Sequence, residues 1–171
     1  MRWTVYALFV LAIFAATPGA AQDATHIHVR SLEPAINQLI ARGLERSATF
    51  GALVAAIDAS DSYVYIRSGD CRGGVRSCFV AVTGAESTRF LWVEINTRKT
   101  DASVVSWIGH ELRHALEVIE QPAVRNNVDI FFFYQRIGTH SLSNTLETRA
   151  AVEAGTKIRQ EVIAYERHRT R

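Results

Sequence analysis

The chain has 171 residues, of which 48% are hydrophobic, and its formal net charge is +2. This balance excludes the strongly basic surface that nucleic-acid binding requires. The length and apolar content suit one core, and the sequence contains no internal repeat or low-complexity linker. We therefore expect one folded domain.

The N-terminus has the pattern of a secretory signal peptide. Arg2 precedes an uncharged apolar run, Trp3–Ala16, and the small residues Gly19–Ala21 follow. The run is too short for a comfortable membrane span and ends at a small-residue cleavage pattern, so residues 1–21 are predicted to be removed. An uncleaved anchor is the alternative. The domain over 22–171 would then be exported, to a periplasm or further, with no stable membrane span.

Two cysteines, Cys71 and Cys78, are the only ones in the chain. An even number of cysteines in an exported protein favours a disulfide. A metal-binding pair is the alternative, but a six-residue spacing is unusual for zinc. We predict a disulfide that closes a short loop.

The first half of the chain predicts two helical segments followed by strands. Apolar spacing predicts a helix over Pro34–Arg46, and Phe50–Ala59 reads as a short helix or a buried strand, with the helix favoured. Tyr63–Ile66 and Cys78–Val82 read as two strands joined across the cysteine loop as a hairpin. Arg89–Ile95 alternates as a third strand.

The second half predicts helices. A long helix should run from Thr100 or Asp101 to about residue 120, ahead of Pro122. Further helices are expected over Asn126–Gly138 and Leu146–Arg167. The predicted fold class is therefore α+β, with a small, mainly antiparallel sheet packed against helices.

The sequence His110-Glu111-Leu112-Arg113-His114 is an H-E-x-x-H motif. Residues four apart on a helix lie one above the other, so both imidazoles can bind one metal ion, and Glu111 can reach a water on that ion. Both histidines lie opposite the apolar side of the helix, so they are not core residues that fill apolar space. Two histidines on a solvated helix face are the alternative to a metal site. Glu117, three residues later, is a surface carboxylate or an acceptor for an imidazole N–H.

A catalytic zinc site usually has three protein ligands, so a third is needed. Glu147 is favoured because it lines up with the apolar stripe of the final helix, where a carboxylate requires a cation. The alternative is a capping box over Asn144–Glu147, in which the glutamate folds back on the helix start. The other candidates are Glu117, His140, Glu153, His26 and His28.

The motif together with Glu147-Thr148-Arg149-Ala150-Ala151 resembles the gluzincin group of zinc metallopeptidases. The resemblance covers about residues 89–166 and implies a zincin-like fold with one Zn²⁺ per chain. It makes His110, His114 and Glu147 the zinc ligands and Glu111 the general base. Ala151 stands where many relatives carry aspartate, so a partner for one histidine is either missing or supplied by Glu117.

The resemblance implies hydrolysis of a peptide or protein substrate. Tyr134, Arg136 and His140 are candidates to polarise the scissile carbonyl, because they precede the glutamate on segments that could border the cleft. In zincins the strand before the motif helix commonly lies at an edge, so Arg89–Ile95 is expected to pair with an extended peptide. The alternatives are a zinc-binding or interaction domain without activity, and hydrolysis of another amide or an ester.

Overall fold

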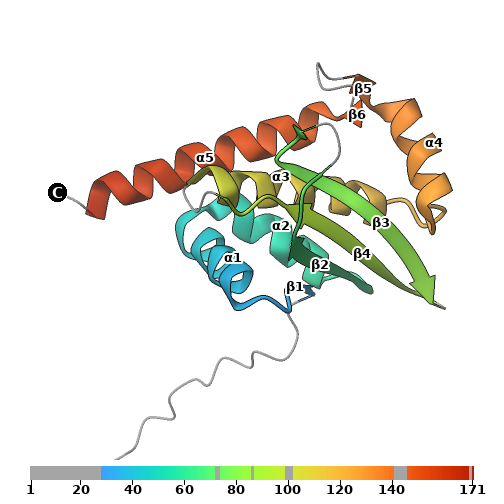
Figure 1. The fold of residues 1–171 in the computed structure, drawn as a ribbon, viewed down its shortest axis with the longest axis horizontal. Coiled ribbons are helices and arrows are strands. Elements are labelled where there is room, and N and C mark those ends of the chain that lie inside the picture. The colour runs from blue at the N-terminus through green and yellow to red at the C-terminus, as the bar shows by residue number, and fades with distance from the viewer. Residues whose placement is uncertain (1–27, 72–73, 86, 99–101, 141–145, 170) are drawn as a thin grey trace, which may run out of the picture.

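The computed structural model describes residues 28–71, 74–85, 87–98, 102–140, 146–169 and 171. The predicted signal peptide and the predicted helix start at Thr100 or Asp101 lie outside these residues. The described elements, in chain order (Figure 1), are β1 (Val29–Arg30), α1 (Pro34–Arg46), α2 (Ala48–Asp58), β2 (Ser62–Ser68), β3 (Ser77–Ala85), β4 (Thr88–Ile95), α3 (Ala102–Ile119), α4 (Asn127–Ile137), β5 (Thr139–His140), β6 (Leu146–Glu147) and α5 (Arg149–Arg169).

The α+β class is confirmed, but the predicted strand pairing is wrong in two respects. The main sheet has the order β1-β2-β4-β3, and within the described residues its β1–β2 and β2–β4 pairs are parallel. Only β3 and β4 are antiparallel, so the sheet is mixed rather than mainly antiparallel. The expected hairpin between β2 and β3 does not form either, because β4 lies between these strands.

Burial explains why β4 occupies the inner position. Leu91, Val93 and Ile95 on β4 are fully buried, and the first two pair in register with buried Val64 and Ile66 of β2. Strand β3 exposes Val80 and Thr83 and suits an edge. A local turn signal shows only that the chain reverses direction. Which strands become neighbours in the sheet depends on which apolar side chains are buried together.

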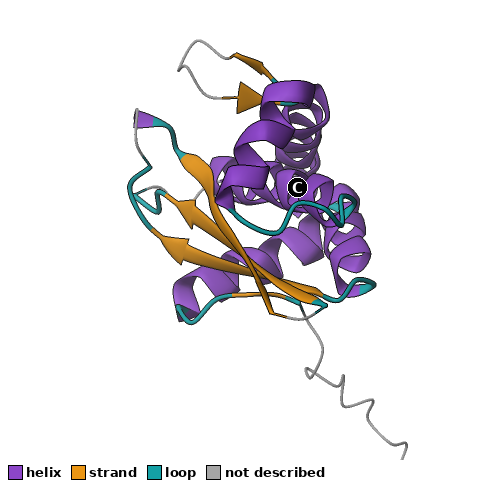
Figure 2. Ribbon diagram, turned by 90° about the vertical axis from the view of Figure 1, so that its right-hand side faces the viewer, coloured by secondary structure: helices purple, strands orange, loops and turns teal. Residues whose placement is uncertain are grey.

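The helices cover the apolar side of the sheet. Most of them lie to one side of it (Figure 2), where α1, α2 and α3 contact the strands. Segment 50–59, left open between helix and strand, belongs mostly to helix α2. Helix α5 runs along α3, and α4 contacts β3 and β6. None of the helices in the described residues is both long enough and apolar enough to cross a membrane.

The predicted disulfide between Cys71 and Cys78 is present. It joins the segment after β2 to the second residue of β3. The start of β3, including Ser77, is therefore tied covalently to the end of a strand on the far side of β4.

Two glycines allow α3 and α5 to approach closely. A Cβ atom added to Gly109 of α3 would lie 2.1 Å from the Ile158 Cδ1 atom, in a fully buried position. A Cβ atom on Gly155 of α5 would lie 3.2 Å from the His110 Cβ atom. Larger residues would push the helices apart. The close approach brings the start of α5 to the histidine-bearing part of α3.

Buried Arg89 holds the C-terminal end of α3. Its guanidinium donates to the main-chain carbonyls of Val118 (2.9 Å), Ile119 (2.7 Å) and Gln121 (2.9 Å). The last carbonyls of a helix lack partners within the helix, and a cation there also favours the helix dipole. Arg89 therefore anchors α3 to strand β4.

Glu161 of α5 caps the start of α2. Its carboxylate accepts hydrogen bonds from the Ser47 hydroxyl (2.5 Å) and from the amide (3.0 Å) and hydroxyl (2.8 Å) of Thr49. Burial by itself raises the pKa of Glu161, but these hydrogen bonds outweigh it and lower the pKa. The N-terminus of a helix favours a negative charge, so the ionised carboxylate stabilises the contact between α2 and α5.

We expect Glu161→Gln to lower the free energy of unfolding by about 1–2 kcal/mol at pH 7. A carboxylate with a lowered folded-state pKa stabilises the fold above its unfolded pKa, and this stability is lost as the pH falls through the folded-state pKa. The difference from wild type should therefore be full above about pH 5 and shrink below about pH 4. Urea denaturation at several pH values measures it. Exposed Glu153→Gln is the control, and an equal, pH-independent loss in both variants would contradict the capping role.

Candidate metal centre

The H-E-x-x-H motif lies in the second half of α3, and its polar face is covered rather than solvated. Glu111 is 3% exposed, and His114 and Glu117 are each 6% exposed. The alternative of two histidines on a solvated helix face therefore does not hold for His114. The helical spacing separates the two sides of α3 correctly, but β3, α4 and the start of α5 cover the polar side.

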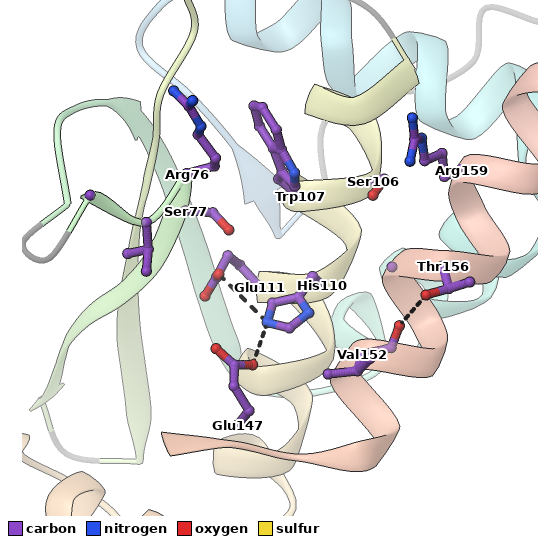
Figure 3. A pocket seen from close by; sticks show the side chains of 13 residues that line it. Arg76, Ser77, Ser106, Trp107, His110, Glu111, Glu147, Val152, Thr156 and Arg159 are labelled. Atoms are coloured by element: carbon purple, nitrogen blue, oxygen red, sulfur yellow. Dashed lines mark hydrogen bonds and ion pairs between the residues drawn. The ribbon is translucent and has the colours of Figure 1, made fainter. Parts of the chain in front are cut away.

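Two imidazoles and one carboxylate converge at this face. The Glu147 Oε2 atom lies 2.9 Å from the His110 Nε2 atom and 3.4 Å from the His114 Nε2 atom. One ligand atom from each of the three residues lies within 4.8 Å of the others. Tetrahedral zinc with bonds of about 2.0–2.1 Å places its ligand atoms about 3.3 Å apart, so these separations fit one ion. Figure 3 shows the His110 ring facing the carboxylates of both Glu111 and Glu147.

Glu147 reaches the histidines from strand β6, not from the first turn of the final helix as expected. It lies in strand β6, paired with Thr139 of β5, and α5 begins two residues later. The Thr148 hydroxyl accepts a hydrogen bond from the Ala151 amide (3.2 Å) and so caps α5. The predicted helix start at Leu146 is therefore wrong, and so is the capping box with Glu147. Thr148 takes the capping role and leaves the Glu147 carboxylate to face α3.

Glu117 holds both segments of the cluster. One carboxylate oxygen lies 3.1 Å from the His114 Nδ1 atom, and the other accepts a hydrogen bond from the Thr148 hydroxyl (2.7 Å). A carboxylate on Nδ1 keeps the proton there and leaves Nε2 free to bind a metal. Glu117 thus occupies the role expected in place of an aspartate at Ala151.

Glu111 is the buried carboxylate beside the cluster. Its Oε1 atom lies 4.0 Å from the His110 Nε2 atom. Burial raises the pKa of Glu111, while the charges of His114 and His110 and a hydrogen bond from the Ser77 hydroxyl act in the opposite direction. A carboxylate with a raised pKa holds and returns a proton more readily than an ordinary glutamate does.

The electrostatics of the cluster favour a cation. Burial alone would lower the pKa of His114, but hydrogen bonds to Glu117 and Glu147 and the nearby carboxylate charges raise it to about 9. Burial alone would raise the pKa of Glu147, but hydrogen bonds from His110 and His114 hold it below its ordinary value. The carboxylates of Glu111, Glu117 and Glu147 surround the two imidazoles. Imidazole nitrogens and carboxylate oxygens form a donor set that fits a divalent ion such as zinc.

Two cavities flank the cluster. The larger, of about 560 Å³, lies between β3, α3 and α5, and the smaller, of about 230 Å³, lies between β3, α3, α4 and β6. Val75, Ser77, Glu111 and Glu147 line both. The cluster therefore lies at the junction of two hollows, with room for a substrate on either side.

The candidates for polarising a carbonyl lie in different surroundings. Buried Tyr134 lines the smaller cavity, but its hydroxyl donates to the His114 main-chain carbonyl (2.9 Å), so its contact holds the histidine helix. His140 and Arg136 are exposed and line neither cavity. The geometry brings Tyr134 to the cluster and leaves the other two outside it.

The remaining third-ligand candidates also lie elsewhere. Exposed Glu153 pairs with Arg149 (2.6 Å). The His28 ring packs against Tyr63, with ring centroids 4.4 Å apart. His26 lies outside the described residues. A second possible metal group, Cys71, Cys78 and Glu94, has both sulfurs in the disulfide and offers no thiolate.

Sequence reasoning missed several residues of the site. Ser77, Arg76 and Trp107 line the larger cavity, and Thr148 links Glu117 to the segment that carries Glu147. Thr148 had a usable signal, since a threonine just before a helical pattern is a favoured N-cap. Ser77 and Arg76 follow from the edge position of β3, Trp107 lies on α3, and none of the three carries a local signal.

Comparison of this chain with protein-family models, with curated proteins and with solved structures found no match. The interpretation of the site therefore depends on its own residues and geometry.

Glu117→Ala should lower the free energy of unfolding of the metal-free protein by roughly 2–4 kcal/mol, because it leaves the buried Thr148 hydroxyl and the His114 Nδ1 atom without their acceptor. Urea denaturation of chelator-treated protein at pH 7 measures this change. The control is Glu120→Ala, directly after the end of α3 with its side chain 54% exposed, which should change stability by less than about 0.5 kcal/mol. Similar losses in both variants would show that Glu117 does not hold the cluster together.

Proposed function

We propose that this protein is an exported zinc-dependent metallopeptidase of the gluzincin type, with a zincin-like arrangement of the active-site helix. His110, His114 and Glu147 hold one Zn²⁺, and Glu111 is the general base. The observation that carries the proposal is the convergence of these three ligand atoms within 4.8 Å, beside a buried carboxylate that borders the same cavities.

The residues of the cluster divide the chemistry of hydrolysis. When bound, zinc would lower the pKa of a bound water toward about 7 and polarise the scissile carbonyl. Glu111 takes a proton from the attacking water and passes it to the leaving amine nitrogen as the C–N bond breaks. The Ser77 hydroxyl lowers the pKa of Glu111 and so favours the ionised carboxylate that accepts this proton. Glu117 and the Tyr134 hydroxyl fix the position of His114.

The edge strand supports a peptide as substrate, although it is not the strand expected. Strand β4 has β2 and β3 on its two sides and cannot accept another strand. The edge next to the site is β3, and Ser77 on this strand lines both cavities. An extended peptide can add to such an edge through main-chain hydrogen bonds, which would place its carbonyls along the cluster.

A closed, purely structural zinc site is the competing interpretation. Such a site needs the histidines and Glu147 but has no use for a buried carboxylate at Glu111 or for cavities on both sides of the ligands. Both features favour an open, reactive site. Export is proposed from the signal-peptide pattern of residues 1–21, and the Cys71–Cys78 disulfide is compatible with an oxidising compartment.

The first test is metal content. Purified protein should carry about one zinc per chain, and His110→Ala should lose it, because two remaining ligands hold zinc far more weakly than three. Elemental analysis after extensive dialysis measures the ratio. His140→Ala is the matched control, since this exposed histidine lies outside the cavities and should leave the zinc content unchanged. Zinc-free wild-type protein that also fails to bind added zinc would rule out the metal centre.

The second test separates catalysis from metal binding. Glu111→Gln should retain zinc while the rate of hydrolysis of a fluorescently labelled, unfolded protein falls by at least about 100-fold, because the amide cannot take the proton. Glu120→Gln, directly after the end of α3, should keep wild-type activity. Zinc-loaded wild type without hydrolysis of any peptide or protein, or Glu111→Gln with full activity, would leave only the structural zinc site.

A further inference from the structure

The larger cavity has two chemically different ends. His110, Glu111 and Glu147 line one end. Arg76, which precedes β3, and Arg159 of α5 lie toward the other end, with Trp107 of α3 between them in the upper part of Figure 3. Three separate elements therefore place two cations and an aromatic ring around one end of the cleft.

Neither arginine has a charge partner among the described residues. Several other arginines do pair with carboxylates, as in the contacts of Arg67 with Glu94 (2.6 Å) and Arg46 with Glu166 (2.6 Å). Within the described part of the chain, the guanidinium groups of Arg76 and Arg159 make no ion pair or hydrogen bond. The acidic residues that line this cavity, Glu111 and Glu147, belong to the metal cluster. Both guanidinium groups are therefore available to a ligand.

The arrangement selects the charge and the orientation of a ligand. A guanidinium binds a carboxylate through two parallel hydrogen bonds, and a second cation strengthens that preference. The carboxylates of Glu111 and Glu147 repel an anion at the other end of the cavity. An anionic group is thus held at Arg76 and Arg159, while the rest of the ligand extends toward the histidines.

The direction of β3 indicates which part of a peptide carries that group. Residues 74–77 line the larger cavity, and residues 77–79 continue along the smaller one. If a peptide adds antiparallel to β3, as β4 does on the other side of that strand, it runs from the smaller cavity to the larger, and its C-terminal part reaches the arginines. Phe79, Ile130 and Leu146 give the smaller cavity an apolar lining that suits an apolar side chain on the N-terminal part.

We propose that Arg76 and Arg159 form a binding site for a carboxylate group on the C-terminal side of the cleaved bond. The inference rests on the proposed peptidase function and specifies its substrate class. The carboxylate is either an acidic side chain or the free C-terminus of a short peptide. Both have the same chemistry, and amidation of the C-terminus tells them apart.

The test measures binding separately from cleavage. Zinc-loaded Glu111→Gln protein is titrated with fluorescein-labelled peptides of one sequence, and anisotropy gives each Kd. The peptides carry Glu, Gln or Lys at successive positions after a central leucine, each with a free or an amidated C-terminus. We expect the best carboxylate-bearing peptide to bind roughly ten-fold more tightly than its amide counterpart.

Variants then assign the preference to the two arginines. The ratio of the two Kd values should fall to about one when Arg76→Gln and Arg159→Gln are combined, and Arg159→Glu should favour the lysine peptide. Lys157→Gln is the matched control, since this exposed lysine on the same helix lies outside the cavity and should keep the ratio. Zinc content and circular dichroism verify that each variant is folded.

The outcomes separate this inference from the proposed function. A carboxylate preference that disappears in the arginine variants supports the site, and dependence on amidation identifies the terminal carboxylate as its target. Binding without such a preference, or a preference unchanged in the variants, overturns the inference even if wild-type protein cleaves peptides. A preference assigned to the arginines without cleavage by wild type would retain the carboxylate site and overturn the peptidase function.

Discussion

The metal cluster depends on one buried carboxylate, that of Glu117. Its two oxygens engage His114 on α3 and Thr148 at the start of α5, and Thr148 directly follows Glu147. The segment that carries the carboxylate ligand is therefore tied to the helix that carries the imidazoles. This contact is short and shielded from water, so it limits the relative movement of the two segments. Preorganised ligands lose little conformational freedom when an ion binds, which favours affinity.

Packing farther from the cluster fixes the geometry of the contact between Glu117, His114 and Thr148. Gly109 and Gly155 let α3 and α5 approach closely, and Arg89 holds the far end of α3 against the sheet. Glu161 links α5 to the start of α2. The two ligand-bearing segments thus belong to helices that are fixed at several points along their length. A site of this kind is placed by rigid elements, whereas a site built on loops alone would leave the ligand distances free to vary.

Features of the fold and the site can be predicted from the sequence when they depend on residues that are close together in the chain. The histidine pair follows from helical spacing, and the helices of the first half follow from apolar periodicity, because both signals are local. Glu147 was selected as the third ligand because it lines up with the stripe of α5, yet it lies in β6 before that helix. The order of the strands and the burial of His114 depend on segments far apart in the chain, and the sequence patterns contain no direct record of those contacts.

The segment around the disulfide brings several of these features together. Arg76, Ser77 and Cys78 are consecutive, and they supply a cation to the larger cavity, a hydrogen bond to Glu111 and a covalent link to Cys71. The same segment begins the edge strand that lines both cavities. An edge strand lacks neighbours on one side and is free to shift, so a crosslink at its start limits where Ser77 and Arg76 can lie. The disulfide, which by its sequence pattern indicates only an oxidising compartment, thus also restrains the part of the larger cavity that lies next to Glu111. In the proposed peptidase, substrate binding and proton transfer would both depend on this short, crosslinked segment at the start of β3.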